Sequence, residues 1–249
     1  MHLSGKTVLL TGATGSIGQD IARELARDGA RVMLHYGRNT TKAEALAKEL
    51  GGALIVQGDL STPAGPTRLW DDAIAVAGEI HALVNNAGQL TPSSVSDPLE
   101  AWHAVWQSDL QVNLMAAADL CRAAIQHFRI IGGGRIVNIA SRAGQGGYRA
   151  EAMSYGATKA ALINLTQSIA RGFGPENIHA TAIAPGWVKT EMSDAYVAQH
   201  GEAAALSGIP IGRMAHTQEI GELVSFVLRP TQASLSGAVL DVNGASQMR

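Results

Sequence analysis

Short apolar runs alternate with longer segments of helical periodicity along almost the whole chain. Each run holds four to six residues, mostly Val, Ile, Leu and Ala. Strands that are apolar throughout, rather than at every second residue, are typical of parallel sheets covered on both faces. Because crossovers between parallel strands are right-handed, the pattern predicts an α/β fold with a doubly wound parallel sheet of about seven strands. The expected strands are residues 7–10, 31–35, 53–56, 82–85, 135–139, 179–184 and 239–242.

The segments between the runs predict helices, and nothing in the sequence divides the chain. The clearest helical patterns are residues 17–28, 42–50, 69–77, 99–118 and 155–173. A chain of 249 residues suits one α/β domain, which we expect to span residues 1–249. Residues 187–214 have no clear pattern, and a long loop in a compact domain is usually functional.

Composition and charge exclude several classes of protein. With 46% hydrophobic and 16% charged residues, the chain can bury a large core and is not expected to be disordered. A net charge of −2 gives no field that would attract nucleic acid or an anionic membrane. No run approaches the ~18 apolar residues of a membrane span, and the N-terminal apolar stretch is too short for a signal peptide. We therefore expect a soluble, cytoplasmic protein in which the single cysteine, Cys121, packs in the core.

A glycine-rich turn follows the first expected strand and opens the first expected helix. Its glycines are Gly12, Gly15 and Gly18. Glycines at such a turn let the backbone approach a pyrophosphate, whose charge the helix N-terminus stabilises. A turn with only a structural role remains the alternative.

Tyr155 and Lys159 have the spacing that proton-transfer chemistry requires. One helical turn separates them, so both lie on the same face of the expected helix 155–173. A nearby ammonium should lower the pKa of the phenol from about 10 toward neutrality. Ser141 follows the expected strand 135–139, at the end of the strand where open α/β sheets bind ligands. The pair alone would also fit a surface helix, and the eight scattered histidines lack metal-binding spacing, so no metal is expected.

Seven motifs occur together in order, and in this arrangement the chain resembles the classical short-chain dehydrogenase/reductase family. It is most similar to the members that resemble 3-oxoacyl reductases, and the resemblance runs from about Gly5 to Gly244. Two departures stand out: the family glycine expected at Ser16 is replaced, and the interval from Ser141 to Tyr155 is one residue longer than in many relatives. The motifs are residues 11–18, Asp59, residues 85–88, Asn113, Ser141, Tyr155 with Lys159, and residues 185–186.

The resemblance implies a Rossmann-type fold and a role for each motif. Tyr155 would transfer the proton, Ser141 would bind the carbonyl oxygen, and Lys159 would bind the nicotinamide ribose. Asn113, which the residues alone would place on the surface, would hold a water of a proton relay, and Asp59 would bind the adenine amine or cap the next helix. Residues 187–214 would form a substrate lid. The implied cofactor-binding residues are Gly12, Thr14, Gly15, Ser16, Ile17, Gly18, Arg38, Asp59, Leu60, Asn86, Ala87, Gly88, Tyr155, Lys159, Pro185, Gly186, Val188 and Thr190.

The end of the second expected strand favours NADP(H) over NAD(H). An NAD site commonly places a carboxylate there, but this chain has Tyr36. Arg38 follows two residues later, and a guanidinium suits a 2′-phosphate. Against this, Gly15 stands where many NADP-dependent relatives carry a second basic residue, and Arg38 could be a solvated loop charge. NAD(H) therefore remains possible.

The resemblance implies hydride transfer between the nicotinamide cofactor and a small-molecule carbonyl or alcohol. A 3-oxoacyl thioester, a sugar and a small ketone all stay open, although the lack of a basic cluster disfavours an acidic carrier protein. A dinucleotide-binding sensor or scaffold without catalysis is the alternative, which the complete set of catalytic residues disfavours. The family also implies a homotetramer, with alanine-rich helices 99–118 and 155–173 at its interfaces.

Overall fold

Seven parallel strands form one sheet in the computed structural model, which describes residues 1–248 apart from the side chains of Met192 and Ala195. The order is β3-β2-β1-β4-β5-β6-β7, so the chain winds outward in both directions from β1 and β4. This is the predicted doubly wound sheet, and all seven expected strands are present. The strands are β1 (Thr7–Leu10), β2 (Arg31–Tyr36), β3 (Leu54–Gln57), β4 (Ala82–Asn85), β5 (Gly134–Ile139), β6 (Ile178–Pro185) and β7 (Val239–Val242).

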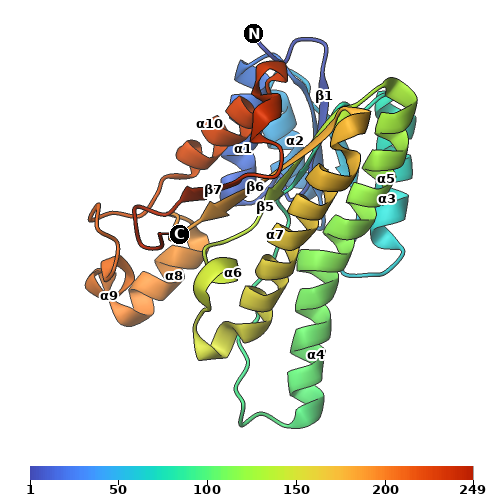
Figure 1. Ribbon diagram of the computed structural model, residues 1–249. Coiled ribbons are helices and arrows are strands. Elements are labelled where there is room, and N and C mark those ends of the chain that lie inside the picture. The colour runs from blue at the N-terminus through green and yellow to red at the C-terminus, as the bar shows by residue number, and fades with distance from the viewer. Residues whose placement is uncertain (249) are drawn as a thin grey trace.

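Helices cover both faces of the sheet (Figure 1). The helices α1, α2 and α10 pack on one face, and α3, α5 and α7 pack on the other. The α-helices are α1 (Ser16–Arg27), α2 (Thr40–Glu49), α3 (Gly65–Ala77), α4 (Leu99–Leu110), α5 (Ala116–Ile131), α6 (Ala143–Gly146), α7 (Met153–Phe173), α8 (Glu191–His200), α9 (Glu202–Leu206) and α10 (Thr217–Leu228). Four shorter helical segments are η1 (Gln111–Met115), η2 (Ala150–Ala152), η3 (Gly174–Glu176) and η4 (Pro230–Leu235).

The sheet separates two apolar layers, and neighbouring residues of one strand enter different layers. Val8 and Leu10 pack with Leu25 of α1, whereas Leu9 between them packs with Leu120 of α5. Each strand is therefore apolar at every position because both of its faces are buried. Cys121 lies in the second layer, where burial raises its thiol pKa to about 12. This agrees with the expected packing role.

The structure refines the expected helices at two places. The pattern over residues 99–118 is the end-to-end series of α4, η1 and α5, and η1 is a π-helical turn. The patternless residues 187–214 include two short helices, α8 and α9. Among the described residues, no helix is long and apolar enough to cross a membrane.

Candidate active site

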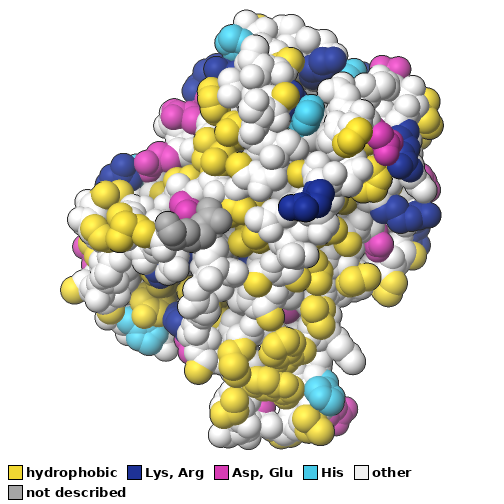
Figure 2. Space-filling model, in the orientation of Figure 1, with side chains coloured by type: hydrophobic (Ala, Val, Ile, Leu, Met, Phe, Trp, Pro, Cys, Tyr) yellow, Lys and Arg dark blue, Asp and Glu magenta, His cyan; other side chains and the backbone are white. Residues whose placement is uncertain are grey.

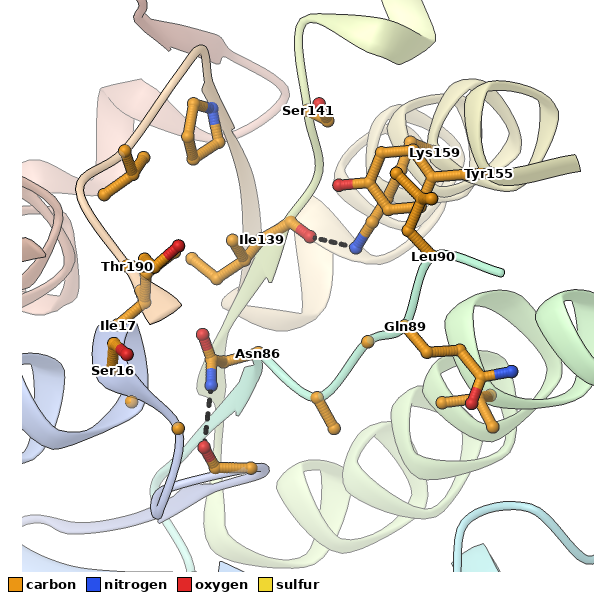
Figure 3. A pocket seen from close by; sticks show the side chains of 18 of the residues that line it. Ser16, Ile17, Asn86, Gln89, Leu90, Ile139, Ser141, Tyr155, Lys159 and Thr190 are labelled. Carbon is orange, nitrogen blue, oxygen red and sulfur yellow. Dashed lines mark hydrogen bonds between the residues drawn. The ribbon is translucent and has the colours of Figure 1, made fainter. Parts of the chain in front are cut away.

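A cavity of about 680 Å³ opens where the loops after β1, β4, β5 and β6 meet (Figure 3). In an open parallel sheet this place is the topological switch point, here between β1 and β4, because the chain leaves these neighbouring strands in opposite directions. Every residue expected to bind the cofactor lines the cavity, and so does Ser141. Asn113 does not line it and lies behind its wall.

The glycine-rich turn forms a cradle at one end of the cavity. Gly12 has φ +64°, and a Cβ there would lie 2.9 Å from the Ala87 Cα atom. A Cβ on Gly18 would lie 2.2 Å from the Gly12 carbonyl oxygen. Gly15 differs, because its φ is −75° and its nearest contact would be an ordinary 3.5 Å. The turn therefore needs glycine at positions 12 and 18 but not at 15.

The N-terminus of α1 faces this cradle without a side-chain cap. Gly15 is the N-cap residue, and the first turn carries no acidic residue. Helix N-terminal N–H groups without an internal partner attract anions, particularly phosphates. The cradle and the uncapped helix together fit the pyrophosphate of a dinucleotide.

His35 of β2 supports the cradle, a role that the sequence did not reveal. The Gly12 N–H donates to His35 Nδ1 over 3.0 Å, and His35 Nε2 lies 3.1 Å from the Gly58 carbonyl oxygen. Because that carbonyl can only accept, Nε2 carries the proton and the ring is neutral. Burial lowers the His35 pKa to about 4. The imidazole thus joins the turn after β1 to the end of β3.

The consecutive residues Asn85 and Asn86 hold neighbouring strands together through side-chain hydrogen bonds. Asn85 Nδ2 donates to Asn138 Oδ1 over 2.9 Å, which joins β4 to β5. Asn86 Nδ2 donates to the carbonyl oxygens of Thr11 and Gly12, which fixes the glycine turn against the end of β4. The two side chains therefore hold the ends of β1, β4 and β5 in place beside the cavity.

Tyr155 and Lys159 lie on α7 and face the cavity together (Figure 3). Lys159 Nζ donates to the Ile139 carbonyl oxygen over 2.8 Å and lies 5.7 Å from the centre of the Tyr155 ring. Gly88 permits this approach, since a Cβ there would lie 3.3 Å from Lys159 Nζ. Ser141, two residues after β5, makes a side-chain hydrogen bond with Tyr155. These three side chains converge from α7 and β5.

Burial shifts the pKa values of Tyr155 and Lys159 so that the neutral form of each side chain is favoured. The Tyr155 pKa rises to about 12, chiefly through desolvation, although the Ser141 hydrogen bond acts in the opposite direction. Desolvation lowers the Lys159 pKa to about 8. The expected lowering of the phenol pKa is therefore wrong for the free protein, because desolvation of the buried phenol raises its pKa more than the Ser141 hydrogen bond lowers it. At neutral pH Tyr155 holds its proton.

Asn113 is fully buried in the π-helical turn η1, not on the surface. Its Oδ1 accepts from the Gln89 N–H over 2.8 Å, and its Nδ2 donates to the Gln89 carbonyl oxygen over 2.9 Å. Nδ2 also lies 3.3 Å from Thr158 Oγ1, one residue before Lys159. The asparagine thereby connects the loop after β4 to the helix that carries Lys159.

Asp109 is a buried carboxylate beside this connection, and its place in the site could not be recognised from the sequence. Ser154 donates to its Oδ2 over 2.7 Å, and Gln89 Nε2 lies 3.2 Å from its Oδ1. The negative charge of Asp109 contributes to the raised pKa of Tyr155. Asp109 contacts Ser154, the residue directly before Tyr155, so its charge belongs to the electrostatics of the site.

Polar groups line the cavity around Asp59, which follows β3 on the side of the cradle. The side chain of Asp59 accepts from the Ser61 N–H and hydroxyl over 2.9 and 2.6 Å, so it closes a local turn. The hydrogen bonds from Ser61 are the main cause that lowers the pKa of Asp59 below its usual range. The positive charges of Arg38 and Arg68 act in the same direction. Arg38 is exposed at the cavity wall.

Residues after β6 close the remaining side. The Gly186 N–H donates to the Val242 carbonyl oxygen over 2.9 Å, which fixes this loop to β7. Thr190 is the N-cap of α8 and shares a capping box with Ser193. Its side chain points toward the cavity in Figure 3, and Thr190 is one of the residues that line it.

The doubly wound sheet with a glycine turn at its switch point defines a Rossmann-type α/β protein. A family model described as enoyl-(acyl carrier protein) reductase matches residues 12–245. The 3-oxoacyl-(acyl-carrier-protein) reductase of Escherichia coli is 32% identical over 254 residues, covering all of both chains. The cis-4-hydroxycyclohexanecarboxylate dehydrogenase of Sinomonas cyclohexanicum is 32% identical over 243 residues, with 96% of this chain and 95% of that protein covered.

A solved structure extends the likeness to three dimensions. A mutant short-chain dehydrogenase/reductase of Serratia marcescens superposes with a TM-score of 0.90 at 28% identity, and the match covers 100% of both chains. The chain belongs to the short-chain dehydrogenase/reductase family, and it is an oxidoreductase acting on CH–OH or carbonyl groups.

Proposed function

We propose that the protein transfers a hydride between a nicotinamide dinucleotide and a small carbonyl or alcohol substrate at Tyr155. The observation that carries the proposal is the convergence of Tyr155, Lys159 and Ser141 beside the glycine cradle in one cavity. The cradle, the uncapped α1 N-terminus and the loops after β4 and β6 would hold the dinucleotide. When bound, the nicotinamide supplies or accepts the hydride.

The side chains would divide the remaining work. In the reductive direction Tyr155 gives its proton to the carbonyl oxygen as the carbonyl carbon receives the hydride. Ser141 donates a hydrogen bond to that oxygen and stabilises its developing charge. Lys159, fixed by the Ile139 carbonyl, places a cation beside the ribose and the phenol. Asn113 positions the helix turn and loop that surround Lys159.

Replacement of Tyr155 by Phe tests this function. Loss of a general acid should lower kcat by at least ~100-fold, since proton transfer contributes about 10²–10⁴. Turnover is measured against a panel of ketones and alcohols with both coenzymes, and cofactor binding is measured separately by fluorescence. The variant should still bind the dinucleotide, because the phenyl ring is retained. Near-normal kcat in the variant would contradict the assigned mechanism.

We propose further that NADP(H) is the preferred coenzyme. Arg38 lies near Asp59, exposed at the wall of the same cavity, where a guanidinium can bind a 2′-phosphate in bidentate fashion. Tyr36 provides no carboxylate to accept hydrogen bonds from the ribose of NAD. The E. coli relative is a reductase of 3-oxoacyl carrier-protein substrates, which fits the reductive direction that a protonated Tyr155 favours.

The Arg38→Ala variant tests the coenzyme preference. It should raise KM for NADPH about 10-fold or more, the effect of losing charged hydrogen bonds, and change KM for NADH little. Arg68→Ala, the other cation near Asp59, serves as the matched control. A wild-type protein with the higher kcat/KM for NADH would overturn the assignment.

We also propose that the chain acts as a homotetramer and that residues 187–214 form a lid over the substrate. Apolar side chains exposed on α4, η1 and the beginning of α7 support the first proposal (Figure 2). The position of α8 directly after the cavity-lining Thr190 supports the second.

A further inference from the structure

Arg149 lies among three aromatic rings at the substrate end of the cavity. Its Cζ atom is 5.1 Å from the centre of the Tyr148 ring, 5.2 Å from that of Tyr196 and 6.0 Å from that of Trp187. The rings come from separate segments: Tyr148 from the loop before α7, Trp187 from the loop after β6, and Tyr196 from α8. A guanidinium is thus held where the loop and the expected lid meet.

The cluster is in direct contact with the catalytic phenol. The centre of the Tyr148 ring is 6.0 Å from that of Tyr155 and 5.1 Å from the guanidinium carbon. Tyr148, Arg149, Trp187 and Tyr155 all line the cavity. A substrate whose reacting carbon lies at Tyr155 can therefore reach the guanidinium across the Tyr148 ring.

Some N–H donors of the Arg149 guanidinium remain available to bind a ligand. Aromatic rings engage the faces of a guanidinium, whereas its N–H donors point outward in its plane. Its ionic partner among the described residues is Glu151, at 3.3 Å from Nε, and Nε itself is buried without a well-aligned hydrogen bond. The Arg149 side chain is 31% exposed, so its remaining donors can reach the cavity.

The charges around this end favour an anion. Arg142 also lines the cavity, whereas the Glu151 side chain is 50% exposed and Glu191 pairs with Lys42. Arg149 is thus a cation with one exposed and imperfectly aligned counter-charge. A carboxylate offers the planar, bidentate partner that a stacked guanidinium suits best.

We propose that Arg149 binds a carboxylate of the substrate, so that the enzyme selects hydroxy or oxo acids over neutral alcohols and ketones. This inference rests on the proposed hydride transfer, because it assigns the substrate class of the same site. The ring contacts of Tyr148, Trp187 and Tyr196 orient the guanidinium, and the carboxylate displaces Glu151 or shares the cation with it.

Matched acids and amides separate this role from a purely structural one. The wild type and the variants Arg149→Gln, Arg149→Lys and Glu151→Gln are assayed with oxo acids of increasing chain length and with the amide of each. Arg122→Gln, an exposed arginine on α5 outside the cavity, is the control. Wild type should prefer the acid, and Arg149→Gln should lower kcat/KM for the acid by about 10- to 100-fold while changing that for the amide little. Glu151→Gln should improve KM for the acid.

Equal loss on acids and amides in Arg149→Gln would show that Arg149 only fastens the loop to α8, and would overturn the inference while leaving the proposed function intact. A wild type that turns over acid and amide equally well would overturn it too. Binding of benzoate and benzamide to the NADPH complex is measured by calorimetry, which needs no turnover. Benzoate bound no more tightly than benzamide would reject the carboxylate site even if no substrate were found. Absence of turnover on every compound would instead count against the proposed function.

Discussion

At the scale of single residues, burial sets the charge states of the site. Tyr155 and Lys159 both have pKa values moved toward the neutral form, to about 12 and about 8. Their spacing predicted the reverse shift for tyrosine, since a spacing shows which groups are neighbours but not how much water surrounds them. The free enzyme is therefore set to donate a proton from Tyr155.

His35 should make folding stability depend on pH. The His35 pKa falls from 6.5 in the unfolded chain to about 4 in the folded protein. Between these two pH values the unfolded chain binds a proton at His35 and the folded protein does not. Stability is complete above about 6.5 and decreases as the pH falls toward about 4, by on the order of 3 kcal/mol at 1.36 kcal/mol per pKa unit. Protonation at Nδ1 would also break the bond from the Gly12 N–H.

Urea denaturation of the wild type and His35→Gln between about pH 7 and about pH 5 measures this effect. The wild type should lose stability more steeply than the variant as the pH falls. His103→Gln, an exposed histidine of α4, provides the control for a change of residue type. Equal slopes in wild type and His35→Gln would show that the buried imidazole does not control stability in this range.

At the scale of elements, the sequence predicted the strands well because their apolar runs directly reflect burial on both faces. Every expected strand is present, and the observed ends differ by one residue or none. Helical periodicity over residues 99–118 could not reveal the π-helical turn, since the five residues Gln111–Met115 are too short a segment to show a period of their own. The helices of residues 187–214 escaped notice because α8 has almost no apolar face to mark it.

The site residues likewise differ in whether they could be recognised from the sequence. Tyr155, Lys159 and the glycines are recognisable because their chemistry depends on spacing within one segment. His35 could not be recognised, since both of its partners lie 23 residues away and its strand looks like any other. Asp109 likewise depends on Ser154, which is distant in the sequence and is brought near only by the packing of α4 on α7.

At the scale of the molecule, the proposed tetramer needs apolar surface outside the core. Part of the surface expected at the interfaces, on helices 99–118 and 155–173, is not available, since Ala116, Ala117 and Leu162 are buried within the single chain. Other residues remain exposed over α4, η1 and the beginning of α7, where Figure 2 shows hydrophobic side chains gathered. They include Leu99, Leu110, Met115 and Met153.

A charge on this surface should break the assembly. Met115 is 47% exposed on η1, and Met115→Glu should shift sedimentation from a tetramer of the 25.9 kDa chain toward smaller species. Val76→Glu, on a 51% exposed residue of α3, should leave the assembly unchanged. A wild type that sediments only as a 25.9 kDa species at micromolar concentration would refute the proposal.

The geometry of Gly15 has a consequence for how such an enzyme can change over evolution. The backbone demands glycine at positions 12 and 18, but position 15 has an ordinary φ of −75° and room for a Cβ. A side chain can therefore be acquired there without reshaping the turn. A basic side chain placed there should strengthen the proposed preference for NADP(H) by a single substitution, while the fold beneath stays as it is.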